Sequence, residues 1–390
     1  MASPHPDPRG SRDTAPTCRW CRSTQGDVVL DLGDQPPADL FPAGDDPGPD
    51  PVHPLRMWLC ASCGLAQLAE DPTTPDEPRG AEPQALVDQA RDAVARVEAA
   101  GLVPAGGGTV TEFGSPHGGS WLDLLAGAGL AEVTDGRPAD VVVDCFGLMH
   151  EADQREGLAA RAAATAPDGV LVLQFHTLAA IVADGGWNAL RHGHFAYYST
   201  PVLTAMLAEI GFEVTHALLF DLYGGTVLLA ARRTGVPGPR DEVSVQTQIE
   251  REEGVGVRDA GVVAALGAAA DASAGTLREH LAERRDAGRS VIGYAAASRA
   301  VPLLNRASVG PDLLPAIADG SPGKWGRRVP GVAVPIVGPE EVTRRAPDEV
   351  VLFVTDLLEE MRTRLPEVEA AGGRWVVVDP TVRVAPPRRT

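Results

Sequence analysis

Two Cys-x-x-Cys pairs constrain the first part of the chain more than any other feature of the sequence. The pairs are formed by Cys18, Cys21, Cys60 and Cys63. Four thiolates at this spacing match a closed tetrahedral zinc site, in which cysteine fills every position and the metal is structural. A redox dithiol is the alternative, but two pairs within one short module favour metal. The sequence therefore predicts a structural zinc module over residues 17–70.

A short apolar strand, a glycine-rich turn and a helix follow one another between Thr109 and Leu125. In α/β domains this arrangement opens a nucleotide site, because glycine lets the backbone approach the ligand and the helix N-terminus offers free N–H groups. Glu112, directly before the turn, suits a class I S-adenosylmethionine (SAM) methyltransferase better than a dinucleotide enzyme. A tight turn with no ligand is the alternative. The candidate cofactor-binding residues are Glu112, Gly114, Ser115, Gly118 and Asp135.

The strand that should wall the adenine is missing from this pattern. Asp135 follows the next expected strand, Leu130–Thr134, where an acid would hold the ribose hydroxyls. Only Gly136, Arg137 and Pro138 then precede another strand, Ala139–Asp144. A parallel crossover needs a dozen or more residues, usually with a helix. We therefore expect a shortened SAM-type α/β domain over residues 71–235, ending in an antiparallel pair of strands.

The densest polar and aromatic segment runs from His192 to Tyr198. It should form a loop over the carboxyl ends of the strands. We therefore expect His194 to share one cleft with His150, which follows the expected strand Ala139–Asp144. An imidazole titrates near neutral pH and suits acid–base catalysis, although plain surface histidines are the alternative. The catalytic candidates are His194, His192, His150, Tyr197 and Tyr223.

The last part of the chain, residues 236–390, is predicted to be a second, smaller α/β domain. A long helix with apolar residues at helical spacing is expected at Arg258–Ala287, followed by a strand at Ser290–Tyr294 and further parallel strands. Ligands of such sheets bind at the carboxyl ends of the strands. This rule places the candidate site near Ser298, Asp319 and Asp356.

Charge and hydropathy restrict the partners of the chain. Its 34 Lys and Arg and 53 Asp and Glu residues give a net charge of −19, which argues against nucleic acid because phosphate binding relies on clustered basic residues. No apolar run approaches the ~20 residues of a membrane span. Residues 1–16, expected to be disordered, contain no apolar signal-peptide core. We expect a cytoplasmic protein that acts on a small molecule, without a nucleic-acid or membrane partner.

Several motifs in the chain occur in an order typical of one family. They are Leu30-Asp31-Leu32-Gly33 after the first cysteine pair, Gly64-Leu65-Ala66-Gln67-Leu68 after the second, Gly293-Tyr294 with Leu304-Asn305, and Asp319-x-Ser321-Pro322-x-Lys324. In this order they resemble the three-domain sugar C-methyltransferases, which act on nucleotide-linked keto-deoxysugars in antibiotic pathways. The resemblance implies zinc, SAM, a nucleotide-linked sugar as substrate, and substrate contacts by Ser298, Arg299, Asn305, Asp319 and Lys324.

The chain departs from this family where the chemistry is expected. The family's Tyr-His-Glu-His segment reads Arg191-His192-Gly193-His194 here, a lysine of the family is Ser298, and a histidine is Tyr223. The leading interpretation is an active C-methyltransferase, in which His194 removes a proton next to a sugar ketone and the enolate attacks the SAM methyl group. The alternatives are a repurposed scaffold that does not use SAM for methyl transfer, doing other acid–base chemistry or only binding, and an inactive partner of another enzyme.

Overall fold

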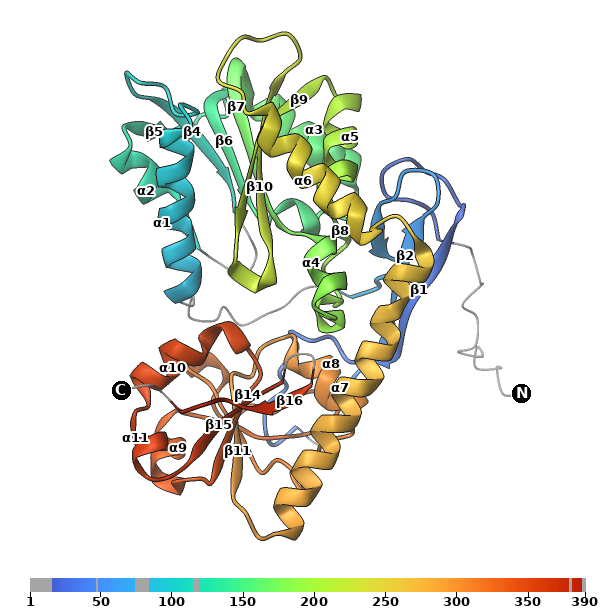
Figure 1. The fold of residues 1–390 in the computed structure, drawn as a ribbon, viewed down its shortest axis with the longest axis vertical. Helices are drawn as coiled ribbons and strands as arrows, with labels where there is room; N and C mark the ends of the chain where they lie inside the picture. The colour runs from blue at the N-terminus through green and yellow to red at the C-terminus, as the bar shows by residue number, and fades with distance from the viewer. Residues whose placement is uncertain (1–15, 47, 74–83, 115–118, 379–380, 388–390) are drawn as a thin grey trace, which may run out of the picture.

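The computed structural model describes residues 16–46, 48–73, 84–114, 119–378 and 381–387. Its strands form three sheets, one of four strands and two of six. Figure 1 shows the two six-stranded sheets one above the other, with the four-stranded sheet beside them. The expected disorder of residues 1–16 falls on positions that, apart from Pro16, lie outside the described residues.

The four-stranded sheet belongs to the cysteine module and has the order β1-β2-β3-β8. Its strands are β1 (Gly26–Gln35), β2 (His53–Cys60), β3 (Ala66–Leu68) and β8 (Ala196–Tyr197). The first two occupy the chain between the cysteine pairs, and β2 ends at Cys60. The fourth comes from the distant histidine segment, because Ala66 pairs with Tyr197 and Gln67 with Ala196. The cysteine module therefore holds one end of the histidine loop.

The upper six-stranded sheet has the order β5-β4-β6-β7-β10-β9. Its strands are β4 (Gly108–Phe113), β5 (Leu130–Glu132), β6 (Ala139–Cys145), β7 (Thr165–His176), β9 (Phe212–Phe220) and β10 (Thr226–Arg233). The first four in chain order are parallel, whereas β10 runs antiparallel to both of its neighbours. This is a class I methyltransferase-like sheet, shortened at the β5 edge as the sequence predicts.

The short connection between β5 and β6 is possible because β5 is short. It pairs only with the first residues of β4, Gly108 to Val110, while β6 pairs along the other side of β4. Residues 133–138 therefore only need to pass around the beginning of β4 to reach β6. No strand lies beyond β5 within the described ranges, so the expected adenine wall is missing there.

Helices cover both faces of this sheet because the buried strands are apolar on both sides. In β6, Val141 and Val143 pack against one helix layer, whereas Val142 packs against the other. The first layer contains α1 (Gln84–Ala99) and α2 (Leu122–Gly127), and the second contains α3 (Gln154–Ala164) and α5 (Thr200–Glu209). Further short segments are η1 (Leu148–His150), α4 (Leu178–Ala183), η2 (Trp187–Ala189) and η3 (Leu222–Gly224).

A carboxylate from a distant part of the chain caps the beginning of helix α5. Ser199 is its N-cap residue, but the side chain makes no capping hydrogen bond. Instead, the buried carboxylate of Glu252 accepts hydrogen bonds from the Thr200 amide and hydroxyl. Glu252 belongs to α6 (Glu242–Val255), a helix that the sequence analysis did not predict. A carboxylate at a helix N-terminus is favoured by both hydrogen bonding and the helix dipole.

The lower six-stranded sheet has the order β13-β12-β11-β14-β15-β16. Its strands are β11 (Val291–Tyr294), β12 (Ile317–Ala318), β13 (Ile336–Val337), β14 (Glu349–Leu352), β15 (Arg374–Val378) and β16 (Val382–Val384), of which only β16 is antiparallel. The remaining segments are α8 (Ala300–Arg306), η4 (Pro322–Lys324), α9 (Glu340–Arg345), η5 (Thr355–Leu357), α10 (Leu358–Arg364) and α11 (Glu367–Ala370). This order is the doubly wound arrangement, in which ligands bind at the carboxyl edge.

A long helix, α7 (Ala260–Asp286), connects the parts of the molecule. Figure 1 shows it running from the four-stranded sheet down along the lower sheet. Leu266, Leu277 and Leu281 face the core that it shares with β1 and α8. Among the described residues, α7 is the one helix long and apolar enough to cross a membrane by length and composition, a test that core helices also pass.

Candidate functional site

A cavity of about 310 Å³ lies between the two six-stranded sheets. From the upper sheet, residues at the carboxyl ends of β6 and β7 line it, including Phe146 and His176. From the lower sheet, residues that follow β11 and β12 line it, including Ser298 and Asp319. Both sheets therefore present their carboxyl edges to one space, the location that the topology of such sheets predicts.

The rings of His150 and His194 lie edge to face, with their centroids 4.5 Å apart. The two rings are in contact, as the expectation of a shared cleft requires, but only His194 lines the cavity and His150 packs against it. His150 Nδ1 lies 2.9 Å from the Gly193 carbonyl oxygen, and the Phe195 amide donates to the Met149 carbonyl oxygen at 2.7 Å. These contacts join the loop after β6 to the histidine loop, and His194 lines the cavity.

Arg191 connects this histidine pair to the lower sheet. Its Nε donates a hydrogen bond to His194 Nε2 at 2.7 Å, and a terminal guanidinium nitrogen donates to Ser298 Oγ. A ring nitrogen that accepts a hydrogen bond carries a lone pair, so His194 is a neutral imidazole in this arrangement. Arg191 and Ser298 are two of the departures from the family motifs, and the structure brings them into contact.

His192 points away from the cavity and does not join His194. Its Nε2 lies 3.1 Å from the Pro54 carbonyl oxygen of β2, and burial lowers the pKa of its ring. Gly193 separates the two histidines with a positive φ of 81°, a conformation that glycine adopts without strain. His194 lines the cavity, whereas His192 secures the loop to the cysteine module and lies outside the candidate catalytic group.

The two tyrosine candidates lie at the cavity, but they differ in what they contact. The Tyr197 hydroxyl accepts from the Arg191 amide at 3.1 Å and donates to the Ala189 carbonyl oxygen at 3.3 Å. Burial raises the pKa of Tyr197 above its usual value, so its phenol stays protonated. The Arg299 guanidinium lies over the Tyr223 ring, with its Cζ atom 4.9 Å from the ring centroid.

Four of the five substrate-binding candidates of the C-terminal part line the cavity: Ser298, Arg299, Asp319 and Lys324. Asn305 is the exception. Its amide nitrogen donates to the Val301 and Pro330 carbonyl oxygens, both at 2.9 Å, so it fastens a turn to α8 instead. Asp356 also lies outside this cavity and lines a separate surface hollow beside α1.

Basic side chains outnumber acidic ones around the cavity. The basic residues are Arg191, Arg299, Lys324 and Arg364, and the acidic residues are Asp319 and Glu360. One acid is already engaged, because Glu360 forms an ion pair with Arg364 at 2.9 Å. A cavity with surplus positive charge in a chain of net charge −19 favours an anionic ligand.

The glycine turn reaches the cavity at Gly119. Gly114 has open space where a side chain would point, and Trp121 lines the cavity. The Glu112 carboxylate accepts from the Trp121 amide at 2.7 Å and the Ser120 hydroxyl at 2.6 Å, so it caps α2. Two further candidates of this turn, Ser115 and Gly118, lie outside the described residues.

Asp135 does not line the cavity, although the sequence analysis assigned the ribose to it. It lies exposed in a turn, 3.5 Å from the Arg137 guanidinium. The reason is the shortness of β5, which ends opposite Val110 while β4 continues to Phe113. The chain turns back before it reaches the carboxyl edge of the sheet. Asp135 therefore lies at this turn and not at the cavity.

The four cysteines of the first module converge on one point. Their sulfur atoms all lie within 4.8 Å of one another, with Cys18 to Cys63 at 3.6 Å and Cys21 to Cys60 at 3.5 Å. A zinc tetrahedron with Zn–S bonds of about 2.3 Å has sulfur–sulfur edges of about 3.8 Å. The donor set therefore fits a closed structural zinc site, as the sequence predicts.

We expect removal of zinc to disrupt the histidine loop as well as the cysteine module. Cys60→Ser removes one ligand next to β2, and β2 supports β3, which pairs with β8 at Tyr197. Metal analysis should find about one zinc per chain in the unmutated protein. Hydrogen exchange of the β3 and β8 amides should become faster in Cys60→Ser. Cys145→Ser, outside the cluster, should keep the metal; a metal-free native protein with four reactive thiols would contradict the zinc site.

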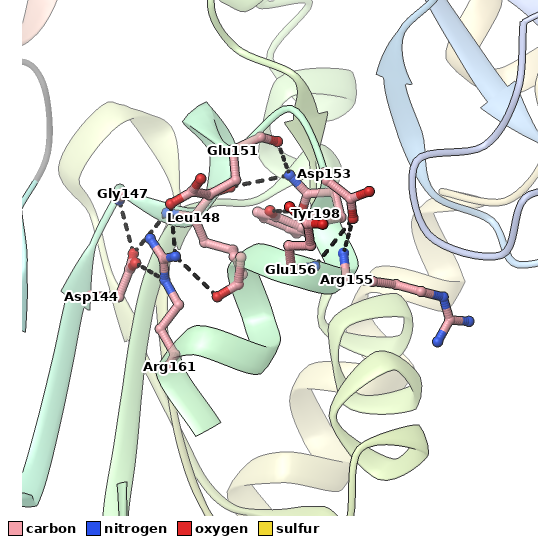
Figure 2. Close-up of polar contacts among 11 residues, drawn as sticks. Asp144, Gly147, Leu148, Glu151, Asp153, Arg155, Glu156, Arg161 and Tyr198 are labelled. Carbon is pink, nitrogen blue, oxygen red and sulfur yellow. Dashed lines mark hydrogen bonds and ion pairs between the residues drawn. The ribbon is translucent and has the colours of Figure 1, made fainter. Parts of the chain in front are cut away.

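A buried ion pair holds the loop that carries His150. The Arg161 Nε donates to Asp144 at 2.7 Å, and the two side chains are 3% and 1% exposed. Another nitrogen of Arg161 donates to Glu151 at 2.8 Å, and Asp144 also accepts from the Gly147 and Leu148 amides. Figure 2 shows these contacts on both sides of the short turn that ends at His150. Arg161 therefore positions this turn from behind the cavity.

Comparisons with known families concern both ends of the chain. Residues 221–380 match a family model described as "C-methyltransferase C-terminal domain". Residues 18–77 match a model described as "Putative zinc binding domain". The curated protein C-methyltransferase NovU from Streptomyces niveus is 25% identical over 411 residues, covering 94% of this chain and 96% of NovU.

Two solved structures are also similar to part of the chain. Magnesium protoporphyrin IX methyltransferase (ChlM) from Synechocystis PCC 6803 has a TM-score of 0.30 and 15% identity, covering 40% of this chain and 90% of ChlM. The 1,6-didemethyltoxoflavin-N1-methyltransferase of Burkholderia thailandensis has a TM-score of 0.25 and 16% identity, covering 44% of this chain and 96% of that protein.

Proposed function

Since this chain belongs to the three-domain C-methyltransferase family, we propose that it transfers a methyl group from SAM to a carbon next to a carbonyl group of a small anionic substrate. The substrate class that fits is a nucleotide-linked keto-deoxysugar or a related metabolite. The observation that carries this proposal is the hydrogen bond that His194 Nε2 accepts from Arg191 in a cavity with surplus positive charge.

The residues of the cavity have complementary roles in this reaction. A neutral imidazole can take the proton from the carbon next to the carbonyl, which is the role of His194. Arg191 moves from His194 Nε2 to the carbonyl oxygen, which frees the lone pair and stabilises the negative charge of the enolate. His150 packs edge to face against His194 and keeps its ring oriented.

The electrons of the broken C–H bond become those of the enolate. When bound, SAM would supply the electrophilic methyl group with which the enolate carbon forms the new C–C bond. The products are the methylated ketone, S-adenosylhomocysteine and the proton held on His194. The residues that would hold the methionine end of the cofactor are Gly114 and the turn that leads to Trp121.

The test of this function is calorimetric titration with SAM and S-adenosylhomocysteine, followed by methyl transfer from labelled SAM to nucleotide-linked keto-deoxysugars. Binding of the cofactor with transfer of label to carbon supports the proposal. The position of Asp135 outside the cavity favours the alternative, a repurposed scaffold that does not use SAM. SAM affinity weaker than millimolar, with no label transferred, would favour that alternative.

A further inference from the structure

His176 is a cavity residue that has no role in the reaction as described so far. It ends β7, where it pairs with Thr226 of β10, and its side chain lines the cavity. The ring lies 6.0 Å from the Tyr223 ring. Its Nε2 is buried and has no hydrogen-bond partner among the described residues. A buried polar atom without a partner is uncommon in a native protein and marks a place where a ligand can supply the partner.

The surroundings of His176 keep its ring neutral. Burial, together with the positive charges of Arg299 and Arg191, lowers the pKa of His176 to about 3, although a backbone hydrogen bond to Tyr223 opposes this shift. The hydrogen bond to the Tyr223 backbone raises the pKa, which means that it stabilises the protonated ring. A ring N–H must therefore be the donor in this bond. The neutral ring therefore gives its N–H to the Tyr223 backbone and keeps a lone pair on Nε2.

Arg299 supplies the opposite kind of contact beside this lone pair. It follows β11 in the lower sheet and lies over the Tyr223 ring. No hydrogen bond or ion pair of its guanidinium occurs within the part of the chain that the structure describes. An arginine has five N–H donors and binds anionic oxygens well. The cavity therefore offers a hydrogen-bond acceptor from the upper sheet next to an anion-binding group from the lower sheet.

We propose that His176 is a specificity-determining residue, whose Nε2 accepts a hydrogen bond from a substrate hydroxyl while Arg299 binds an anionic oxygen of the same molecule. The assignment rests on the proposed function for the substrate class, a hydroxylated sugar linked to a nucleotide. Proton removal is a poor role for His176, because a base works best when its pKa lies near the working pH. A substrate without the hydroxyl leaves a buried acceptor unpaired, which weakens binding by ~10-fold or more.

The test compares ligands that differ by one hydroxyl. A thymidine diphosphate-linked 4-keto-6-deoxyhexose and its 2-deoxy and 3-deoxy forms are titrated calorimetrically without SAM into three proteins: unmutated, His176→Phe and His176→Gln. The unmutated protein should bind one deoxy form ~10-fold more weakly than the parent compound. His176→Phe removes the acceptor and should bind the two equally. His176→Gln keeps an amide oxygen and should restore part of the preference.

A second measurement follows His176 directly. Nitrogen NMR of histidine-labelled protein should show an unprotonated Nε2 that does not titrate between pH 5 and 8 and that shifts when the parent hexose is added. A preference that survives in His176→Phe would overturn the proposal. So would equal binding of all three ligands, or an Nε2 signal that no ligand moves. Selective binding without methyl transfer would retain the role of His176 and reject the proposed reaction instead.

Discussion

Replacement of His194 by alanine is expected to lower turnover by at least ~100-fold, the usual loss when a general acid–base group is removed. The loss should fall on proton removal, because His194 is the neutral ring that lines the cavity beside Arg191. Exchange of the substrate's C–H for deuterium, measured in D₂O without SAM, isolates this step. In His194→Ala both the exchange and the methyl transfer should fall together, while substrate binding changes little.

The matched control is His192→Ala, two positions away in the same loop. His192 contacts the Pro54 carbonyl oxygen of the cysteine module and does not line the cavity. Its removal should therefore affect thermal stability more than the rate of deuterium exchange. A His194→Ala variant with full exchange activity would exclude His194 as the base and leave Tyr223, whose side chain lines the same cavity, as the next candidate.

Arg161→Met is expected to destabilise the protein by about 3–5 kcal/mol, because it leaves the buried carboxylate of Asp144 without its partner. Chemical denaturation of each variant measures this change in the free energy of unfolding. The double variant Asp144→Asn/Arg161→Met removes the buried charge as well and should recover part of the loss. Equal stability of Arg161→Met and the unmutated protein would contradict the structural role of the ion pair.

The loss of folding stability in Arg161→Met should also depend on pH. Burial raises the pKa of Asp144 in the folded protein, and the Arg161 charge opposes this rise, so the variant should raise the pKa further. Where the folded pKa exceeds the unfolded one, the folded state binds more protons, and stability falls as the pH rises through the folded pKa. The destabilisation should therefore be largest near neutral pH and shrink as the pH falls toward the usual aspartate range.

The effect of Arg161→Met should extend to the cavity. Arg161 also binds Glu151, the residue after His150, so its loss frees the turn that holds the edge-to-face histidine pair. We expect slower deuterium exchange in the folded variant, with the substrate affinity less affected. In Arg161→Ala the side chain leaves an open space that added guanidinium, a small cation, can enter, and partial recovery of the exchange rate would support a positioning role.

Local patterns in the sequence determined most elements of the fold. The two cysteine pairs, the apolar runs of β4, β6 and β11, and the helical spacing of α7 each depend on neighbouring residues and are confirmed. The rule that parallel strands meet at one carboxyl edge also placed a distant pair near each other, because the rings of His150 and His194 are in contact, although only His194 lines the cavity.

Only the tertiary structure decided how distant segments meet. The pairing of β8 with β3, the capping of α5 by Glu252 and the contact of Arg191 with Ser298 all join residues far apart in the chain. The sequence correctly placed Asp135 after a strand, but it did not reveal that this strand is too short to bring Asp135 to the cavity. Side-chain direction and strand length depend on packing against the rest of the molecule, so it became visible only in three dimensions that His176 lines the cavity and that its buried Nε2 has no partner among the described residues.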